Sequence, residues 1–169
     1  TDNSILSDPA DSLKIYEWLP EFEFDDKGNC THYLYKKEDE TGFDESLLHN
    51  RNRLKNSAIS YTNLYIDKVL YGNKTPYRQF GDAFPDETDY LFETLFDYGT
   101  TDYITQHIDQ LNPWDFRQDA FSDYKAGFEI RTTRLCKRVL LFHHFKGANE
   151  YDGLVRSLNF EYDTSSEQD

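Results

Sequence analysis

The sequence has no methionine and only two cysteines among its 169 residues. Cys30 and Cys136 lie far apart and form no Cys-x-x-Cys pair, the spacing that would suggest a redox motif. Two free thiols are therefore the favoured interpretation, with a disulfide as the alternative. The missing initiator methionine and the polar ends indicate a piece cut from a longer chain.

Long apolar runs are missing as well. No stretch reaches the roughly 18 apolar residues that a membrane-spanning helix needs. Residues 1–11 are polar and acidic, which is not the pattern of a secretory signal peptide. We therefore expect no direct membrane insertion, and we expect any targeting information to lie outside these residues.

Basic charge is scarce. The chain has 18 basic against 32 acidic residues, which gives a net charge of -14. Binding to DNA or RNA requires basic side chains that displace counterions from phosphates, so a nucleic-acid partner is not expected. An anionic membrane surface is disfavoured for the same reason. The excess of carboxylates favours solubility.

Aromatic residues are what the chain has in plenty, with 13 Tyr and 13 Phe in a sequence that is only 37% hydrophobic. Large rings must therefore supply much of the buried area. A length of 169 residues favours one domain, and a chain of this size can bury about 70% of its unfolded surface.

Alternating and aromatic-rich segments predict a mainly β fold, built from antiparallel strands and hairpins with long loops. Pro20 predicts a bulge or a break in the first strand, and a turn is expected at residues 25–29. A second break is expected near Thr132. The predicted strands cover residues 13–24, 30–35, 61–71, 90–98, 127–145 and 154–163.

The remaining segments predict the domain boundaries. Residues 1–12 are expected to be disordered or a linker, residues 13–163 a β domain segment, and residues 164–169 a disordered tail. Within the domain, residues 38–55 predict a loop or short helix, and residues 100–126 a long irregular connection.

The usual signatures of catalysis are weak here. His143 and His144 are adjacent, so in a strand they point to opposite faces and cannot easily bind one metal ion. Cys136 lies among Leu, Val and Phe with no orienting motif, which is typical of a buried structural cysteine. The Glu21-Phe22-Glu23 pair resembles the end of an ADP-ribosyltransferase site, but the first Arg comes after it, in the wrong order. We therefore predict no catalytic residues.

Binding signatures are equally weak. The turn at Asp25 lacks the ligand spacing and the distal Glu of a calcium loop, so we predict neither metal nor cofactor residues. A basic stripe of Arg131, Arg134, Lys137 and Arg138 could bind an anion, but pairing with neighbouring Asp and Glu is the favoured interpretation. Exposed aromatics could stack on sugars, whereas core packing explains most of them.

The most distinctive stretch is the run from Trp114 to Arg131, which leads into the strand-like segment from Arg134 to Phe145. This stretch resembles the family of the virulence-plasmid B protein, SpvB, in the amino-terminal region that is shared with the B component of insecticidal toxin complexes. Thr133 departs from the family, which usually has an aromatic there. Further similar segments are Asp25–Asn29, Tyr33–Asp39, Arg51–Arg53, Tyr71–Tyr77, Phe96–Gly99 and Leu154–Tyr162.

The resemblance implies a non-enzymatic β-rich section of a secreted toxin or virulence protein. In toxin complexes such sections build a hollow shell around an effector, and in SpvB the actin-modifying enzyme is a separate carboxy-terminal domain. The implied partners are other domains of the parent chain and partner toxin subunits. The implied location is extracellular, with a cytoplasmic stage before export.

Five residues are predicted to organise the long connection: Trp114, Arg117, Tyr124, Phe128 and Arg131. Two other functions stay open. One is a module that recognises protein or carbohydrate through exposed aromatics, and the other, which the motif order argues against, is an ADP-ribosyltransferase.

Overall fold

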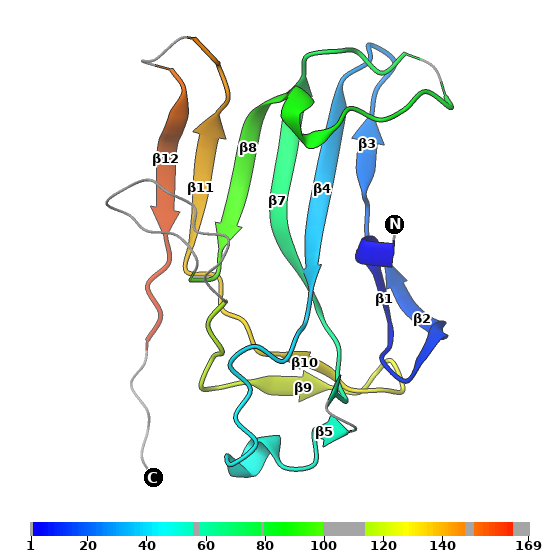
Figure 1. The fold of residues 1–169 in the computed structure, drawn as a ribbon, viewed down its shortest axis with the longest axis vertical. Helices are drawn as coiled ribbons and strands as arrows, with labels where there is room; N and C mark the ends of the chain where they lie inside the picture. The colour runs from blue at the N-terminus through cyan, green and yellow to red at the C-terminus, as the bar shows by residue number, and fades with distance from the viewer. Residues whose placement is uncertain (1, 56–57, 79, 100–113, 148–150, 164–169) are drawn as a thin grey trace.

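The structure is a computed structural model that describes residues 2–55, 58–78, 80–99, 114–147 and 151–163 (Figure 1). Strands dominate it, with three short 3-10 helices. In chain order the elements are η1 (Asp2–Ser4), β1 (Ile5–Asp8), β2 (Asp11–Trp18), β3 (Phe22–Phe24), β4 (Cys30–Lys37), η2 (Leu48–Asn50), β5 (Leu54–Lys55), β6 (Ala58–Ile59), β7 (Leu64–Asn73), η3 (Glu87–Asp89), β8 (Tyr90–Asp97), β9 (Phe121–Asp123), β10 (Ile130–Thr132), β11 (Arg138–His143) and β12 (Gly153–Asn159).

One six-stranded sheet carries the fold, in the order β12-β11-β8-β7-β4-β3 (Figure 1). All of its strand pairs are antiparallel, so the predicted mainly β class is confirmed. Burial alternates along β11, where Leu140 and Phe142 are buried and Val139, Leu141 and His143 are half-buried. Leu140 and Phe142 pack with Leu95 and Leu154 in a cluster across three neighbouring strands.

A hairpin joins β3 to β4 through the turn predicted at residues 25–29. Its turn is closed by Asp25, whose carboxylate accepts hydrogen bonds from the N–H groups of Lys27 and Asn29, both at 2.9 Å. Gly28 has a φ of 91°, and a Cβ there would lie 2.8 Å from the Cβ of Pro76. Glycine is therefore required by both the backbone conformation and the close approach.

The predicted break near Thr132 is also confirmed. β10 ends at Thr132 and β11 begins at Arg138, and the two strands belong to different sheets. β10 pairs with β9, and Figure 1 shows this small pair lying across one end of the main sheet. An isolated bridge between Thr62 and Ile130 ties the pair to the segment before β7.

Two expectations were wrong. Within residues 1–12, expected to be disordered or a linker, Ile5–Asp8 form β1, because they pair with β2 and bury Leu6. Within residues 100–126, expected to be irregular, Phe121–Asp123 form β9, because β10 offers them a partner strand. Residues 100–113 and 164–169 lie outside the described residues, and the boundary at 13–163 stays a prediction.

Candidate functional site

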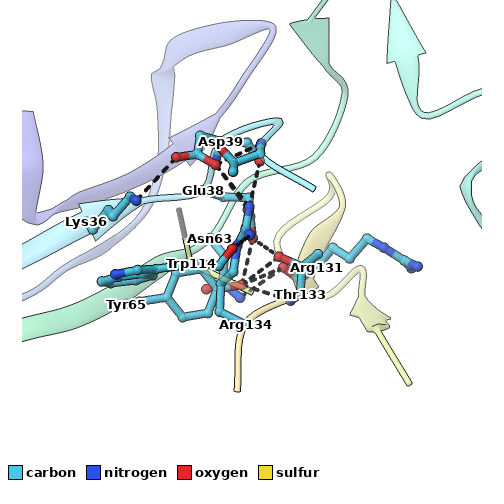
Figure 2. A network of polar contacts seen from close by, with 10 residues as sticks. Lys36, Glu38, Asp39, Asn63, Tyr65, Trp114, Arg131, Thr133 and Arg134 are labelled. Atoms are coloured by element: carbon cyan, nitrogen blue, oxygen red, sulfur yellow. Dashed lines mark hydrogen bonds and ion pairs between the residues drawn. The ribbon is translucent and has the colours of Figure 1, made fainter. Parts of the chain in front are cut away.

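A densely hydrogen-bonded site lies where three separate parts of the chain meet: the end of β4, the segment around Trp114, and the link between β10 and β11 (Figure 2). Glu38 directly follows β4, and its N–H donates to the carbonyl of Asn63 just before β7. The ladder between these two strands thus extends one step further and fixes the backbone of Glu38.

Glu38 and Arg134 form a buried ion pair, with side chains 0% and 2% exposed. The Nη2 atom of Arg134 donates to Oε1 of Glu38 at 2.8 Å, and its Nε donates to the same oxygen at 3.1 Å. Nη1 donates to the carbonyl of Trp114 at 2.7 Å. Nη2 also reaches the Asp39 carboxylate at 3.0 Å. One guanidinium therefore holds two distant segments together.

The second oxygen of Glu38 is occupied as well. Tyr65 donates its hydroxyl to Oε2 at 2.7 Å, and the Thr133 hydroxyl donates to the same atom. The N–H of Thr133 in turn donates to the Tyr65 oxygen at 2.9 Å. Burying two charges is costly, and it is offset only where such hydrogen bonds satisfy the remaining atoms.

Trp114 forms the apolar wall of this site. Its ring stacks on Tyr98 with centroids 4.2 Å apart, and it meets Tyr65 edge-on at 6.0 Å. The Nζ of Lys36 lies 4.5 Å from the ring centroid, in cation–π geometry. The three aromatic rings make a core cluster of their own, separate from the one under β11.

The phenols of this cluster act as donors. Burial raises the pKa of Tyr65, and the nearby charge of Glu38 raises it further. Burial likewise raises the pKa of Tyr98, whose hydroxyl donates to the carbonyl of Ile66 at 3.1 Å. Both side chains therefore stay protonated and keep their hydrogen bonds throughout the physiological range.

A second buried ion pair joins β8 to β11. The Arg138 Nε donates to the Asp97 carboxylate, and both side chains are almost fully buried. The other Asp97 oxygen accepts the N–H of Gly99 at 2.8 Å. The Asp97 carbonyl accepts the N–H of Lys137, also at 2.8 Å. Asp97 therefore anchors the start of β11 through side chain and backbone together.

A third cluster surrounds Glu129 near β9 and β10. Burial alone would raise the pKa of Glu129, but hydrogen bonds from Ser122 (2.6 Å) and Arg53 (2.7 Å) outweigh it and lower the pKa. Arg131 donates from Nη1 to the Ser122 hydroxyl at 2.9 Å. These contacts fasten the loop before β5 to the β9–β10 pair.

The structure brings only some of the five predicted organisers into these networks. Trp114 and Arg131 are buried, in two different clusters. Arg117 pairs with Asp119, and its N–H donates to the Thr133 carbonyl at 2.7 Å. Tyr124 is exposed but adds a side-chain hydrogen bond that helps to lower the pKa of Glu129, and Phe128 is half-buried. Their organising role stays a prediction.

The predicted pairing of the basic stripe with acidic residues is confirmed. Each member lies within 4.0 Å of a carboxylate oxygen, and the partners are Glu129 for Arg131, Glu38 and Asp39 for Arg134, Asp115 for Lys137 and Asp97 for Arg138. Sequence reasoning missed Glu38, Tyr65 and Thr133. Glu38 stands in the charged run Lys36–Glu40, which looks like a solvated loop, so no local signal distinguishes it.

The His and Cys residues that were considered for catalysis or metal binding are engaged in contacts within the fold or are buried. His143 packs edge-on against Phe92 and Phe145, while the Nε2 of His144 lies 2.8 Å from Glu93. Burial raises the pKa of the Cys136 thiol, which disfavours the reactive thiolate. Across the described ranges no group of three or more His, Cys, Asp or Glu is placed to hold a metal ion.

A cleft of about 390 Å³ opens at the β3 edge of the sheet. Phe22 lines it, but its ring is stacked between His32 (4.1 Å) and Phe84 (3.9 Å), so neither face is open to a sugar. The Tyr33 hydroxyl is engaged with Glu23. The other lining residues are Asn3, Ser4, Glu21, Leu34, Tyr35 and Glu87. Among the described residues no helix is long and apolar enough to cross a membrane.

Comparison with protein families gives a match to the family described as Salmonella virulence plasmid 65kDa B protein, over residues 1–145. Among curated proteins, the chain is similar to the mono(ADP-ribosyl)transferase SpvB of Salmonella typhimurium, with 38% identity over 165 residues. The match covers 94% of this chain and 27% of that protein. The chain thus spans about a quarter of the length of this relative.

Solved structures show the same fold. The N-terminal domain of the effector protein SpvB from Salmonella typhimurium strain LT2 matches with a TM-score of 0.77 and 32% identity, over 95% of this chain and 56% of that domain. The TcdB2-TccC3-Cdc42 crystal structure and the Photorhabdus luminescens Tc holotoxin pore each match with a TM-score of 0.78 and 30% identity. In both, the match covers 96% of this chain and 8% of the other.

Proposed function

Because the chain belongs to the SpvB family, we propose that it is a non-enzymatic structural section of a toxin or virulence protein. It contributes to a β shell that carries or encloses a separate effector domain. The matched structures support this proposal, since one is an N-terminal domain of an effector protein and the others are parts of toxin complexes.

The observation that carries the proposal is the outer edge of β12. This strand of 7 residues pairs with β11 on one side only, and among the described residues no strand covers its other side. A long open edge normally invites association and is protected in free-standing domains. In a section of a larger wall, the same edge is the place where the next strand pairs.

The side chains of β12 fit the same interpretation. Val155 and Leu158 are both more than half exposed, and Phe160 and Tyr162 just beyond the strand are exposed as well. Neighbouring exposed apolar groups of this kind mark a contact surface. The edge thus combines unpaired backbone groups with apolar side chains.

The proposed role requires no chemistry from this section. The relative named as a mono(ADP-ribosyl)transferase is much longer than the segment matched here, and the matched SpvB structure is its N-terminal domain. The proposed partners are other domains of the parent chain and partner toxin subunits. The proposed location is extracellular, after a cytoplasmic stage before export.

The experiment tests protection in the full-length parent protein. The Phe160 N–H donates to the Lys137 carbonyl at 2.9 Å, so the alternating pattern turns the N–H of Leu158 toward β11 and that of Ser157 away from it. Ser157→Pro therefore removes one outward donor and spares the β11 ladder. We expect the region after residue 169 to be cleaved by protease at least tenfold faster in this variant.

Ser157→Ala is the matched control, because it keeps the backbone N–H and should leave cleavage unchanged. Deletion of residues 13–163 should expose the downstream region fully. Unchanged protection in both Ser157→Pro and the deletion would reject the shell proposal. Recognition of protein or carbohydrate through exposed aromatics would then become the leading hypothesis.

A further inference from the structure

A two-stranded ribbon leaves the main sheet at the edge opposite β12 (Figure 1). β2 leads into β3, but between them the chain breaks at Pro20, and β2 pairs with β1 instead of β4. The register of the ribbon shifts at two successive positions, between Leu6 and Ser7 and between Ser7 and Asp8. The ribbon is therefore irregular as well as narrow.

Three of the exposed side chains of this ribbon are large and apolar. Leu13 is 88% exposed, Trp18 is 67% exposed, and Tyr16 is also exposed. Trp18 contrasts with Trp114, the other tryptophan of the chain, which is buried. Leu6 is the one buried residue of β1 and β2. A two-stranded ribbon with so little buried surface is marginally stable in water, so this one would be stabilised by a further surface to pack against.

We propose that the β1–β2 ribbon docks on an apolar surface of the further part of its own parent polypeptide, with Trp18 and Leu13 as the buried anchors. The proposal rests on the function proposed above. The solved SpvB N-terminal domain supports it, because this chain covers only 56% of that domain and so a substantial part of such a domain lies beyond the matched residues.

The charged residues of the ribbon limit which kinds of surface could bind it. Lys14 lies 3.5 Å from Asp8 and 3.8 Å from Asp11, so this cation is already matched within the ribbon. Glu17 is exposed beside Trp18. Neither an anionic lipid surface nor an acidic peptide would be attracted to such a site. The expected surface is apolar at its centre, with Lys or Arg facing Glu17.

The two ends of the section then differ in how they join their neighbours. β12 offers backbone groups to another strand, whereas the ribbon offers side chains to a packed surface. Large aromatic anchors in a desolvated pocket typically dominate such interfaces. The section would thus be held at both ends of its sheet.

The test uses the full-length parent protein labelled with 5-fluorotryptophan. Trp18→Phe identifies the fluorine signal of Trp18, and Trp114→Phe identifies that of Trp114, which serves as the buried reference. We expect the Trp18 signal to be as insensitive to a soluble paramagnetic gadolinium chelate as that of Trp114. A Trp18 signal that the chelate broadens strongly would overturn the proposal.

Two other occupants have distinct outcomes. Shielding of Trp18 that disappears when the protein is diluted a hundredfold would mean contact with a second copy. Shielding that appears only with phosphatidylcholine vesicles would mean a lipid surface. Either result overturns the proposal, whereas shielding that is independent of dilution and of vesicles supports it.

A variant pair separates this proposal from the proposed function. Leu13→Ser with Trp18→Ser should raise the rate of protease cleavage within residues 5–18 at least tenfold, while Lys14→Ser should not. An unchanged cleavage rate together with an exposed Trp18 signal rejects the ribbon contact. The shell function is rejected separately, by the Ser157→Pro and deletion measurements.

Discussion

At the scale of single residues, the carboxylate of Glu38 links the end of β4 to β7 and to the segment between β10 and β11. It accepts hydrogen bonds from Arg134, Tyr65 and Thr133, and its side chain is fully buried. A charge in that position is stable only while every partner is present. The joint contribution of these partners is therefore measured by removing the charge itself.

Glu38→Gln should destabilise the protein by about 3–5 kcal/mol, because the change removes the buried counter-charge of the Arg134 guanidinium and leaves it only the partly exposed Asp39 carboxylate. Denaturant unfolding measures the loss. Glu45→Gln, at an exposed position nearby, is the control and should change stability by no more than about 0.5 kcal/mol. Equal effects in the two variants would show that the ion pair does not stabilise the fold.

Trp114→Ala should destabilise the protein by about 3–5 kcal/mol, because it leaves a cavity between Tyr65 and Tyr98. Urea unfolding measures the loss of stability. Lys125→Ala is the control, because the Lys125 side chain is 81% exposed. A loss below about 1 kcal/mol at Trp114 would contradict its role as an organiser.

At the scale of elements, the β3–β4 hairpin depends on the close approach between its turn and the segment after β7. Gly28 and Gly81 both have positive φ, at 91° and 100°, but a Cβ at Gly81 would have no neighbour within 4 Å, whereas one at Gly28 would meet Pro76. The two glycines therefore share the backbone requirement and differ in the available space.

Gly28→Ala should destabilise the protein by roughly 1–3 kcal/mol more than Gly81→Ala, because the added methyl group meets Pro76. Thermal or urea unfolding of both variants gives the difference directly. Equal losses would mean that the turn moves away from Pro76 at little cost.

Most strands were predictable from the sequence, because the alternation of apolar and polar residues and the turn residues are visible within a short segment. The breaks at Pro20 and near Thr132 were visible in the sequence for the same reason. β1 and β9 were missed because each is short and exists through its partner strand. The partners of Arg134 could not be assigned from the sequence, because Glu38 is 96 residues away and no local sequence pattern indicates that the two side chains meet.

At the scale of the whole molecule, a net charge of -14 opposes association through the open β12 edge. The range of that repulsion depends on salt, because the screening length falls from about 30 Å at 0.01 M to about 3 Å at 1 M ionic strength. Charge repulsion and pairing at the open edge therefore act in opposite directions, and higher salt weakens the repulsion.

The segment expressed alone should self-associate more at about 1 M than at about 0.01 M salt, as measured by sedimentation velocity. Ser157→Pro should suppress this association, because it removes an outward donor from the edge strand. Salt-dependent association that Ser157→Pro leaves unchanged would assign the contact to another surface.

The distance along the chain between Glu38 and Arg134 also has a consequence for biosynthesis. During translation the carboxylate emerges 96 residues before its guanidinium partner. Contacts between residues so far apart form slowly, since the intervening chain must be ordered first. The nascent polypeptide should therefore remain open, and accessible to chaperones, until Arg134 has left the ribosome.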